Sequence, residues 1–283
     1  MRFIGLLFTL ILIAQTSFAV VLNAKNYDEG LFFAPAFNIS MLDYELTDLI
    51  GSNGSQLCAP MAMTHAFEFL KNYRNPRFEN LPRVADLDRD GVEDTFKDRV
   101  RYFYQACGTD KNEGTRYRQA INCMDGFIKH SNYNSWTYMI GPHSVNAPPG
   151  SPIESVQHVL RLSEIQYYLK YQAGILMGIG WYKFNPASNM WERTGGHFFN
   201  LYGYATMNGW GENQADLFVV NSWIDYRNRP ADQQFDAIKI SKISYLDPST
   251  VPSDVAYELT GTGFEFAGFK AFVEDIFVAL PYQ

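Results

Sequence analysis

The chain has 283 residues, a hydrophobic fraction of 47% and a formal net charge of −7 at pH 7. This length suits one large domain or two small ones, and the apolar content is ample for a packed core. The acidic balance argues against nucleic acid as the main partner, because phosphate binding needs clustered Lys and Arg.

The first residues have the three parts of a secretory signal. Arg2 precedes an apolar run over residues 3–14, and Ser17-Phe18-Ala19 is a small-x-small motif that suits signal peptidase. The apolar run is shorter than the roughly 20 residues that span a membrane. We therefore expect residues 1–19 to be removed and the mature chain to be periplasmic or secreted. No membrane span would remain, and residues 20–50 would form an N-terminal extension.

A helix is predicted to begin at or just after Cys58. Apolar residues recur from Met61 to Leu70 with the period of 3.6 that marks one face of a helix. Pro60 falls in the first turn, where its missing N–H costs nothing. A helix N-terminus carries about half a positive charge, which lowers the pKa of a thiol placed there. Cys58 is thus a candidate nucleophile.

The chain has three cysteines, Cys58, Cys107 and Cys123. An exported chain meets oxidants, and an odd number leaves one thiol over in a monomer, which is the state we expect. Cys107 and Cys123 lie close in sequence and are the natural pair, whose loop closure would stabilise the fold by about 3 kcal/mol. This pairing leaves the thiol of Cys58 for chemistry, with a buried structural cysteine as the alternative.

Residues 86–94 form a dense acidic loop in which three aspartates alternate before Gly91. This spacing matches the first half of a calcium-binding loop. Lys97 stands where an EF-hand needs Glu, so the segment resembles instead the short Asp-rich calcium loops of exported proteins. We expect a structural Ca²⁺ that pins an insertion at about residues 74–153, with a solvated acidic turn as the alternative. The expected ligands are Asp86, Asp88, Asp90, the carbonyl of Val92, and Asp94.

Helical patterns dominate the first half of the chain and strand patterns the second half. Beyond the helix at Cys58, helices are predicted over 95–106, 115–130 and 153–172, and strands over 173–182, 197–204, 216–223 and parts of 264–280. This distribution predicts an α+β fold. A helical N-terminal half, which carries the nucleophile helix, would pack on an antiparallel sheet or half-barrel from the C-terminal half.

His197 has the strongest context of the five histidines. It opens a predicted strand after Gly195-Gly196, where the backbone is open to a substrate. The next strand ends in Asn221-Ser222-Trp223. If the two strands are neighbours, the Asn221 carbonyl oxygen can accept the ring N–H and hold the imidazole toward a thiol. Trp223 can then shield that bond from water and strengthen it.

The ordered set of Cys58, His197 in Gly-Gly-His and Asn221 in Asn-Ser-Trp resembles the papain-like cysteine peptidases. His197 follows Cys58 by 139 residues, within the papain-type spacing of roughly 130–150. The Cys-Ala-Pro-Met-Ala-Met helix start is closest in style to the bacterial bacteriocin-processing peptidases. The resemblance implies a papain-like domain over residues 51–283. Cys58 would be its nucleophile, His197 its base and then acid, and Asn221 the residue that orients the imidazole.

The resemblance also implies a Gln upstream of the nucleophile that helps to bind the oxyanion. Gln56 lies two residues before Cys58, whereas the family places this Gln several residues earlier, which makes Asn53 an alternative. The chain has Ala59-Pro60 after the nucleophile instead of papain's Gly-Ser, so the substrate specificity of papain is not implied.

The predicted function is therefore that of an exported thiol hydrolase. A cysteine peptidase that cleaves a peptide or protein through an acyl-enzyme on Cys58, without a catalytic cofactor, fits these motifs best. Two alternatives use the same residues. One is cell-wall amide cleavage or transglutaminase-type acyl transfer, and the other is a catalytically inactive papain-like binding module. The substrate groove decides between them, and the motifs do not define it.

Overall fold

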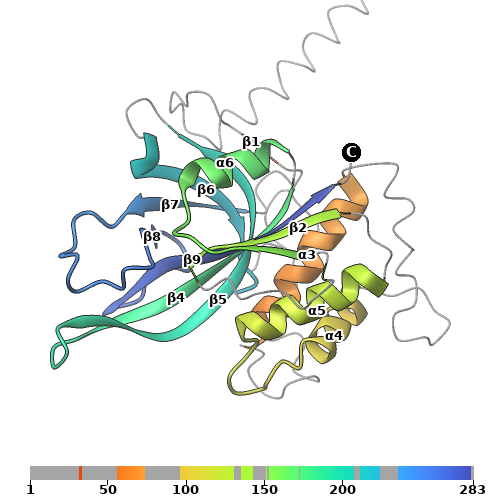
Figure 1. Cartoon of the computed structure of the whole chain (residues 1–283), viewed down its shortest axis with the longest axis horizontal. Coiled ribbons are helices and arrows are strands. Elements are labelled where there is room, and N and C mark those ends of the chain that lie inside the picture. The colour runs from red at the N-terminus through yellow and green to blue at the C-terminus, as the bar shows by residue number, and fades with distance from the viewer. Residues whose placement is uncertain are drawn as a thin grey trace, which may run out of the picture.

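The chain folds around a sheet whose central strands close into a barrel (Figure 1). The structure is a computed structural model that describes residues 32–33, 56–73, 96–130, 135–142, 151, 153–171, 173–206, 211–223 and 235–281. Its strands are β1 (Phe32–Phe33), β2 (Ser135–Ile140), β3 (Ile153–Val156), β4 (Gly174–Asn185), β5 (Met190–Ala205), β6 (Gln214–Val220), β7 (Asp236–Lys242), β8 (Tyr257–Thr260) and β9 (Phe269–Pro281).

The barrel consists of six antiparallel strands. They follow the order β4-β5-β6-β7-β8-β9, and β9 pairs with β4 to close the ring. Three strands extend the sheet beyond the barrel: β1 pairs with β5, β2 pairs with β9, and β3 runs parallel to β2. A short 3₁₀ helix, η3 (Gly211–Asn213), precedes β6.

Successive residues of β4 and β5 face two different cores, because side chains alternate between the two faces of a strand. Met177 and Phe199 belong to the cluster that fills the barrel. Leu176 and Phe198 belong to a second cluster, which the sheet shares with the helices. A residue's position in this alternation therefore decides whether it faces the barrel interior or the helices.

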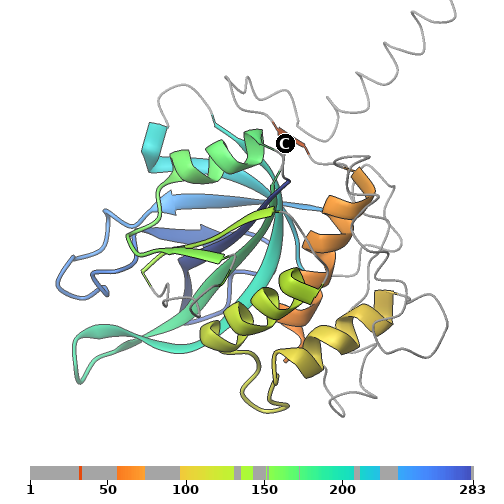
Figure 2. The ribbon, with the colours of Figure 1, turned by 45° about the vertical axis from the view of Figure 1, so that its right-hand side comes forward.

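Four α-helices surround the barrel in the described part of the chain: α3 (Cys58–Tyr73), α4 (Phe96–Ala106), α5 (Tyr117–His130) and α6 (Leu162–Lys170). Figure 2 shows α3, α4 and α5 together on one side of the barrel. Helix α3 packs on β4 and β5. The side-chain amide of Asn200 on β5 donates to the carbonyl of Ala62 on α3 over 2.8 Å, which fixes the helix on the strand.

A disulfide between Cys107 and Cys123 joins the loop after α4 to α5, so the predicted pairing is confirmed. The thioether sulfur of Met63 on α3 lies 3.7 Å from the sulfur of Cys107 and 3.5 Å from that of Cys123. The cross-link therefore lies against α3, and it ties the helical layer together.

The predicted fold, a helical half packed on a sheet or half-barrel, is wrong. The barrel is fully closed, and strands dominate the described residues. The error lies in β7 and β8, strands of 7 and 4 residues that were not predicted. They complete the ring between β6 and β9.

Most of the individual elements agree with the predictions. The helices at 58–73, 95–106 and 115–130 correspond to α3, α4 and α5, and the four strand regions correspond to β4, β5, β6 and β9. The helix predicted over 153–172 is wrong in its first half, where β3 pairs with β2, and only the shorter α6 follows from Leu162.

Candidate active site

Cys58 is the first residue of α3 and is buried, with 9% of its surface exposed. The helix begins as predicted, since the N–H of Met61 donates to the carbonyl of Leu57 over 2.9 Å. The first turn holds no acidic residue. The positive end of the helix dipole therefore acts on the thiol without a nearby carboxylate in that turn to offset it.

His197 and Asn221 meet as predicted. His197 lies on β5, and Asn221 directly follows β6, the strand that pairs with β5. The ring Nε2 of His197 lies 2.9 Å from Asn221 Oδ1. The backbone N–H of Trp223 donates to the same oxygen over 3.1 Å. Because a backbone N–H can only donate, the atom that it approaches is the amide oxygen, and this settles the orientation of the Asn221 amide.

This contact also settles which nitrogen of His197 carries the proton. The amide oxygen of Asn221 can only accept, so Nε2 carries the hydrogen in the neutral ring and Nδ1 keeps its lone pair. Nδ1 is buried and has no hydrogen-bond partner among the described residues. A buried polar atom without a partner is rare in folded proteins and needs an explanation. A reacting group that transfers a proton to Nδ1 would supply such an explanation.

The environment of the ring is dry. His197 is 1% exposed, and the indole of Trp223 stacks on it with ring centroids 3.8 Å apart. Burial lowers the pKa of His197 to about 4, and the hydrogen bond that the ring donates to Asn221 opposes that shift only in part. The imidazole is therefore neutral at pH 7, which is the protonation state that a general base requires.

Cys58 and the His197–Asn221 pair come from elements that pack together. Cys58 belongs to the same apolar cluster as Phe198 and Val220, the residues that follow His197 and precede Asn221. The ring of His197 itself stacks on Phe199, on the barrel side of β5. The sulfur and the imidazole thus belong to neighbouring layers joined by one strand.

Gln56, the predicted oxyanion donor, lies just before α3 and turns toward the loop between α4 and α5. A Cβ added at Gly114 would lie 2.8 Å from its Oε1 atom, so the absence of a side chain at Gly114 makes room for it. Its oxyanion role stays a prediction. The rival donor, Asn53, lies outside the described residues.

A second polar cluster lies four residues before His197 on the same strand. The carboxylate of Glu274 on β9 is completely buried and accepts from Arg193 Nε at 2.7 Å and Arg193 Nη2 at 3.0 Å. The hydroxyls of Tyr117 and Tyr182 donate to it at 2.7 and 2.9 Å. Burial, and then the charge of Glu274, raise the pKa of both tyrosines, so both hydroxyls stay protonated and can donate.

Three glycines make room for the cluster around Glu274. This cluster was not predicted from the sequence. A Cβ at Gly180 would lie 2.2 Å from Glu274 Oε1, and one at Gly196 would lie 2.4 Å from Arg193 Nη2. A Cβ at Gly178 would lie 2.7 Å from the hydroxyl of Tyr117. The signal in the sequence was the unusual set of glycines within two apolar strands, because such glycines often mark the close approach of another group.

The predicted calcium ligands Asp86, Asp88, Asp90, Val92 and Asp94 lie outside the described residues. Within the residues that the structure does describe, no group of three or more His, Cys, Asp or Glu side chains is placed to hold a metal ion.

Two further observations complete the description of the chain. None of the helices in the described ranges is both long enough and apolar enough to cross a membrane. The chain matches no family model, and a search of curated proteins finds no match either.

Proposed function

We propose that the chain is an exported thiol hydrolase, a cysteine peptidase or related amide hydrolase acting on a peptide or protein. The observation that carries the proposal is the buried imidazole of His197. Its Nε2 is held by Asn221 at 2.9 Å, and its Nδ1 has no partner among the described residues. The place of Cys58 at the positive end of α3, and the packing of α3 on β5, the strand that carries His197, support it further.

In the first half of the reaction, Nδ1 of His197 takes the proton of the Cys58 thiol, and the thiolate attacks the carbonyl carbon of the amide. The tetrahedral intermediate collapses when its C–N bond breaks, and His197 gives the proton to the leaving amine. An acyl-thioester on Cys58 remains. Asn221 holds the imidazolium through Nε2 throughout this half-reaction.

In the second half, water attacks the thioester. Nδ1 of His197 takes a proton from that water, the C–S bond breaks, and the proton returns to the sulfur as the acid product leaves. Gln56 is our candidate donor to the oxyanion, and a donor of this kind commonly lowers the barrier by about 3 kcal/mol.

Export is part of the proposal. The signal pattern at residues 1–19 supports it. The disulfide between Cys107 and Cys123 gives independent support, because such bonds persist mainly in oxidising compartments.

The burial of the reacting groups supports a second candidate, a papain-like binding module without activity. Cys58 is 9% exposed and His197 is 1% exposed. A substrate could reach them only if side chains around the site move, and a protein that only binds has no need of such movement.

Alkylation of Cys58 separates the two candidates. Under non-reducing conditions iodoacetamide at pH 7 should label the wild-type chain faster than a free model thiol, and mass spectrometry should place the label on Cys58. His197→Gln should slow labelling and lower hydrolysis of a peptide library at least about 100-fold, the usual contribution of a general base. Cys58→Ala should abolish both. Labelling no faster than that of the model thiol, without peptide cleavage, would leave the binding module as the function.

A further inference from the structure

A line of aromatic rings leads away from His197 across the end of the barrel. Trp223 lies 3.8 Å from His197, Trp181 lies 6.3 Å from Trp223, and Phe266 lies 4.9 Å from Trp181, all between ring centroids. Trp223 is 37% exposed and Phe266 is 48% exposed. Large exposed apolar side chains that continue one another usually mark a binding surface.

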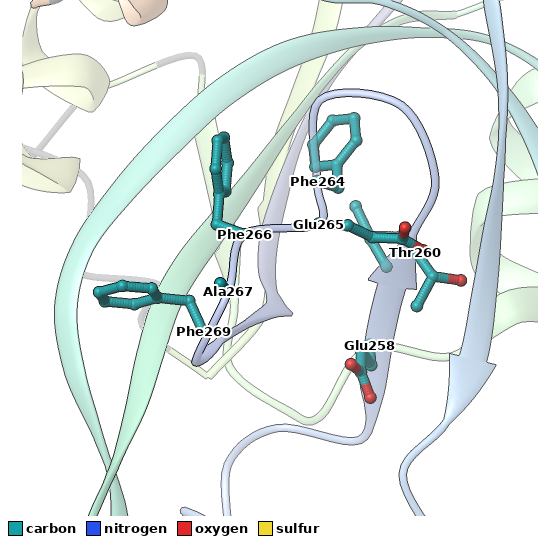
Figure 3. Close-up of a pocket in the computed structure, with 8 residues that line it drawn as sticks. Glu258, Thr260, Phe264, Glu265, Phe266, Ala267 and Phe269 are labelled. Carbon is teal, nitrogen blue, oxygen red and sulfur yellow. The ribbon is translucent and has the colours of Figure 1, made fainter.

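The line ends at a pocket of about 280 Å³ between β8 and the loop that leads to β9. Figure 3 shows the rings of Phe266 and Phe269 on one side of this loop, and the side chains of Glu258, Thr260 and Glu265 on the other. The pocket therefore has an apolar wall on the side of the aromatic line and a polar, acidic wall opposite. Its lining residues are Glu258, Leu259, Thr260, Phe264, Glu265, Phe266, Ala267 and Phe269.

The two carboxylates of the acidic wall differ in their partners. Glu258 is paired with Lys270, whose Nζ lies 2.9 and 3.1 Å from the two carboxylate oxygens. Glu265 is exposed, and its Oε1 accepts only the backbone N–H of Gly261, at 3.0 Å. No cation pairs with Glu265 in the described part of the chain. Glu265 therefore contributes a negative charge without a cation in direct contact, and a second cation near the pocket is Lys183, whose Nζ lies 5.8 Å from the centroid of the Phe269 ring.

We propose that this pocket binds a Lys or Arg side chain of the substrate, an inference that rests on the proposed hydrolase function. The aliphatic stem would lie along Phe266, since long basic side chains cover apolar surface with their stems and the ring of Phe269 is already approached by Lys183. The cation would then meet the carboxylate of Glu265 and the face of the Phe266 ring. A neutral apolar side chain would contact the apolar wall of the pocket but would leave the carboxylate of Glu265 without a cation.

The spacing gives the position of this residue in the substrate. The three steps between ring centroids amount to at most about 15 Å, and an extended chain advances about 3.3 Å per residue. The basic residue should therefore lie at most about four or five residues from the bond that is cleaved.

Binding can be measured without catalysis in the full chain carrying Cys58→Ala. Two fluorescein-labelled ten-residue peptides, identical except for one Arg or one norleucine, would be titrated by fluorescence anisotropy. We expect the Arg peptide to bind about tenfold more tightly, the size of one exposed ion pair and one cation–π contact together. Glu265→Gln should remove this preference, whereas Glu192→Gln, which changes an exposed carboxylate on the β4–β5 hairpin, should keep it. Equal affinities of the two peptides would overturn the proposal.

Cleavage by the wild-type chain distinguishes a failure of the pocket from a failure of the hydrolase. In a peptide library, Lys and Arg should be enriched within about four or five residues of the cleaved bond, and Glu265→Gln should abolish that enrichment alone. Fast labelling of Cys58 without a basic preference would refute the pocket but not the hydrolase. A preference for the Arg peptide together with a slow thiol would refute the hydrolase and leave a basic-peptide binding site.

Discussion

Strand β5 carries two buried polar clusters four residues apart, and they are built in opposite ways. The carboxylate of Glu274 receives four hydrogen bonds, two of them from Arg193. The ring of His197 is held through Nε2 alone, and its buried Nδ1 has no partner among the described residues. A fully paired cluster fixes structure, whereas the second nitrogen of a ring held on one side only keeps a lone pair that can accept a proton. Under the proposed function, the comparison separates the residues that hold the site from those that would react.

Arg193→Met should give the largest effect, and it should act on stability. It leaves the completely buried carboxylate of Glu274 without its cation. Breaking a fully buried pair typically costs about 3–5 kcal/mol, and the loss here should be smaller because the side chain of Arg193 is 42% exposed to solvent. Urea unfolding followed by circular dichroism would measure the loss. The labelling rate of Cys58, measured in the fraction that stays folded, should change far less.

The double variant Arg193→Met/Glu274→Leu is the matched control. Replacing both partners of a buried ion pair by apolar residues is often neutral, so much of the lost stability should return. If Arg193→Met instead left stability intact but stopped hydrolysis, the cluster would belong to the chemistry and the contrast between the two clusters would fail.

The contact between His197 and Asn221 could be predicted because both residues lie in patterned strands. Gly-Gly-His opens one apolar strand and Asn-Ser-Trp closes the next, so pairing of these strands was enough to bring the two side chains together. The helix at Cys58 was predicted for the same reason, since its apolar stripe is long and its start is marked by Pro60. Local periodicity carries information of this kind reliably.

The closure of the barrel and the Glu274 cluster could not be predicted in this way. Closure depends on β8, a strand of four residues, and its pairing with β9 is a long-range choice that no local pattern records. Glu274 lies in a run of apolar residues on β9, and its partners come from α5, β4 and β5. Only the three-dimensional arrangement shows why Gly178, Gly180 and Gly196 lack side chains.

The second prediction concerns pH and follows from the burial of His197. Burial lowers its pKa to about 4 in the folded chain, from an ordinary value of about 6.5 in the unfolded chain. Between these values the unfolded chain binds more protons, so stability falls as the pH falls from about 6.5 towards 4. The loss from this one residue should be on the order of 2 kcal/mol, measured as the free energy of unfolding in urea at pH 7 and pH 4.5.

His197→Gln should reduce that loss, although it lowers stability at pH 7 as well. His65 on α3 is the internal comparison, because burial lowers its pKa to about 4 too. His65→Gln should therefore flatten the pH dependence by a similar amount while leaving the labelling of Cys58 largely unchanged. A wild-type stability that is the same at both pH values would show that neither ring is kept neutral by burial.

The third and smallest effect should come from Trp223, which covers the reactive cluster and has no counterpart over the paired one. Trp223→Ala would admit water to the His197–Asn221 bond, which is now shielded by a ring 3.8 Å away. Because burial is the main cause of the low pKa of His197, that pKa should rise, and the acid limb of the Cys58 labelling profile should move to higher pH. We expect up to about a fourfold loss of hydrolysis at pH 6, the fall in the neutral fraction of His197 if its pKa returns to the ordinary value of about 6.5, equal to about 0.8 kcal/mol. Trp223→Phe, which keeps a ring in place, should retain most of the activity, and an unchanged pH profile in Trp223→Ala would mean that shielding plays no part in preparing the base.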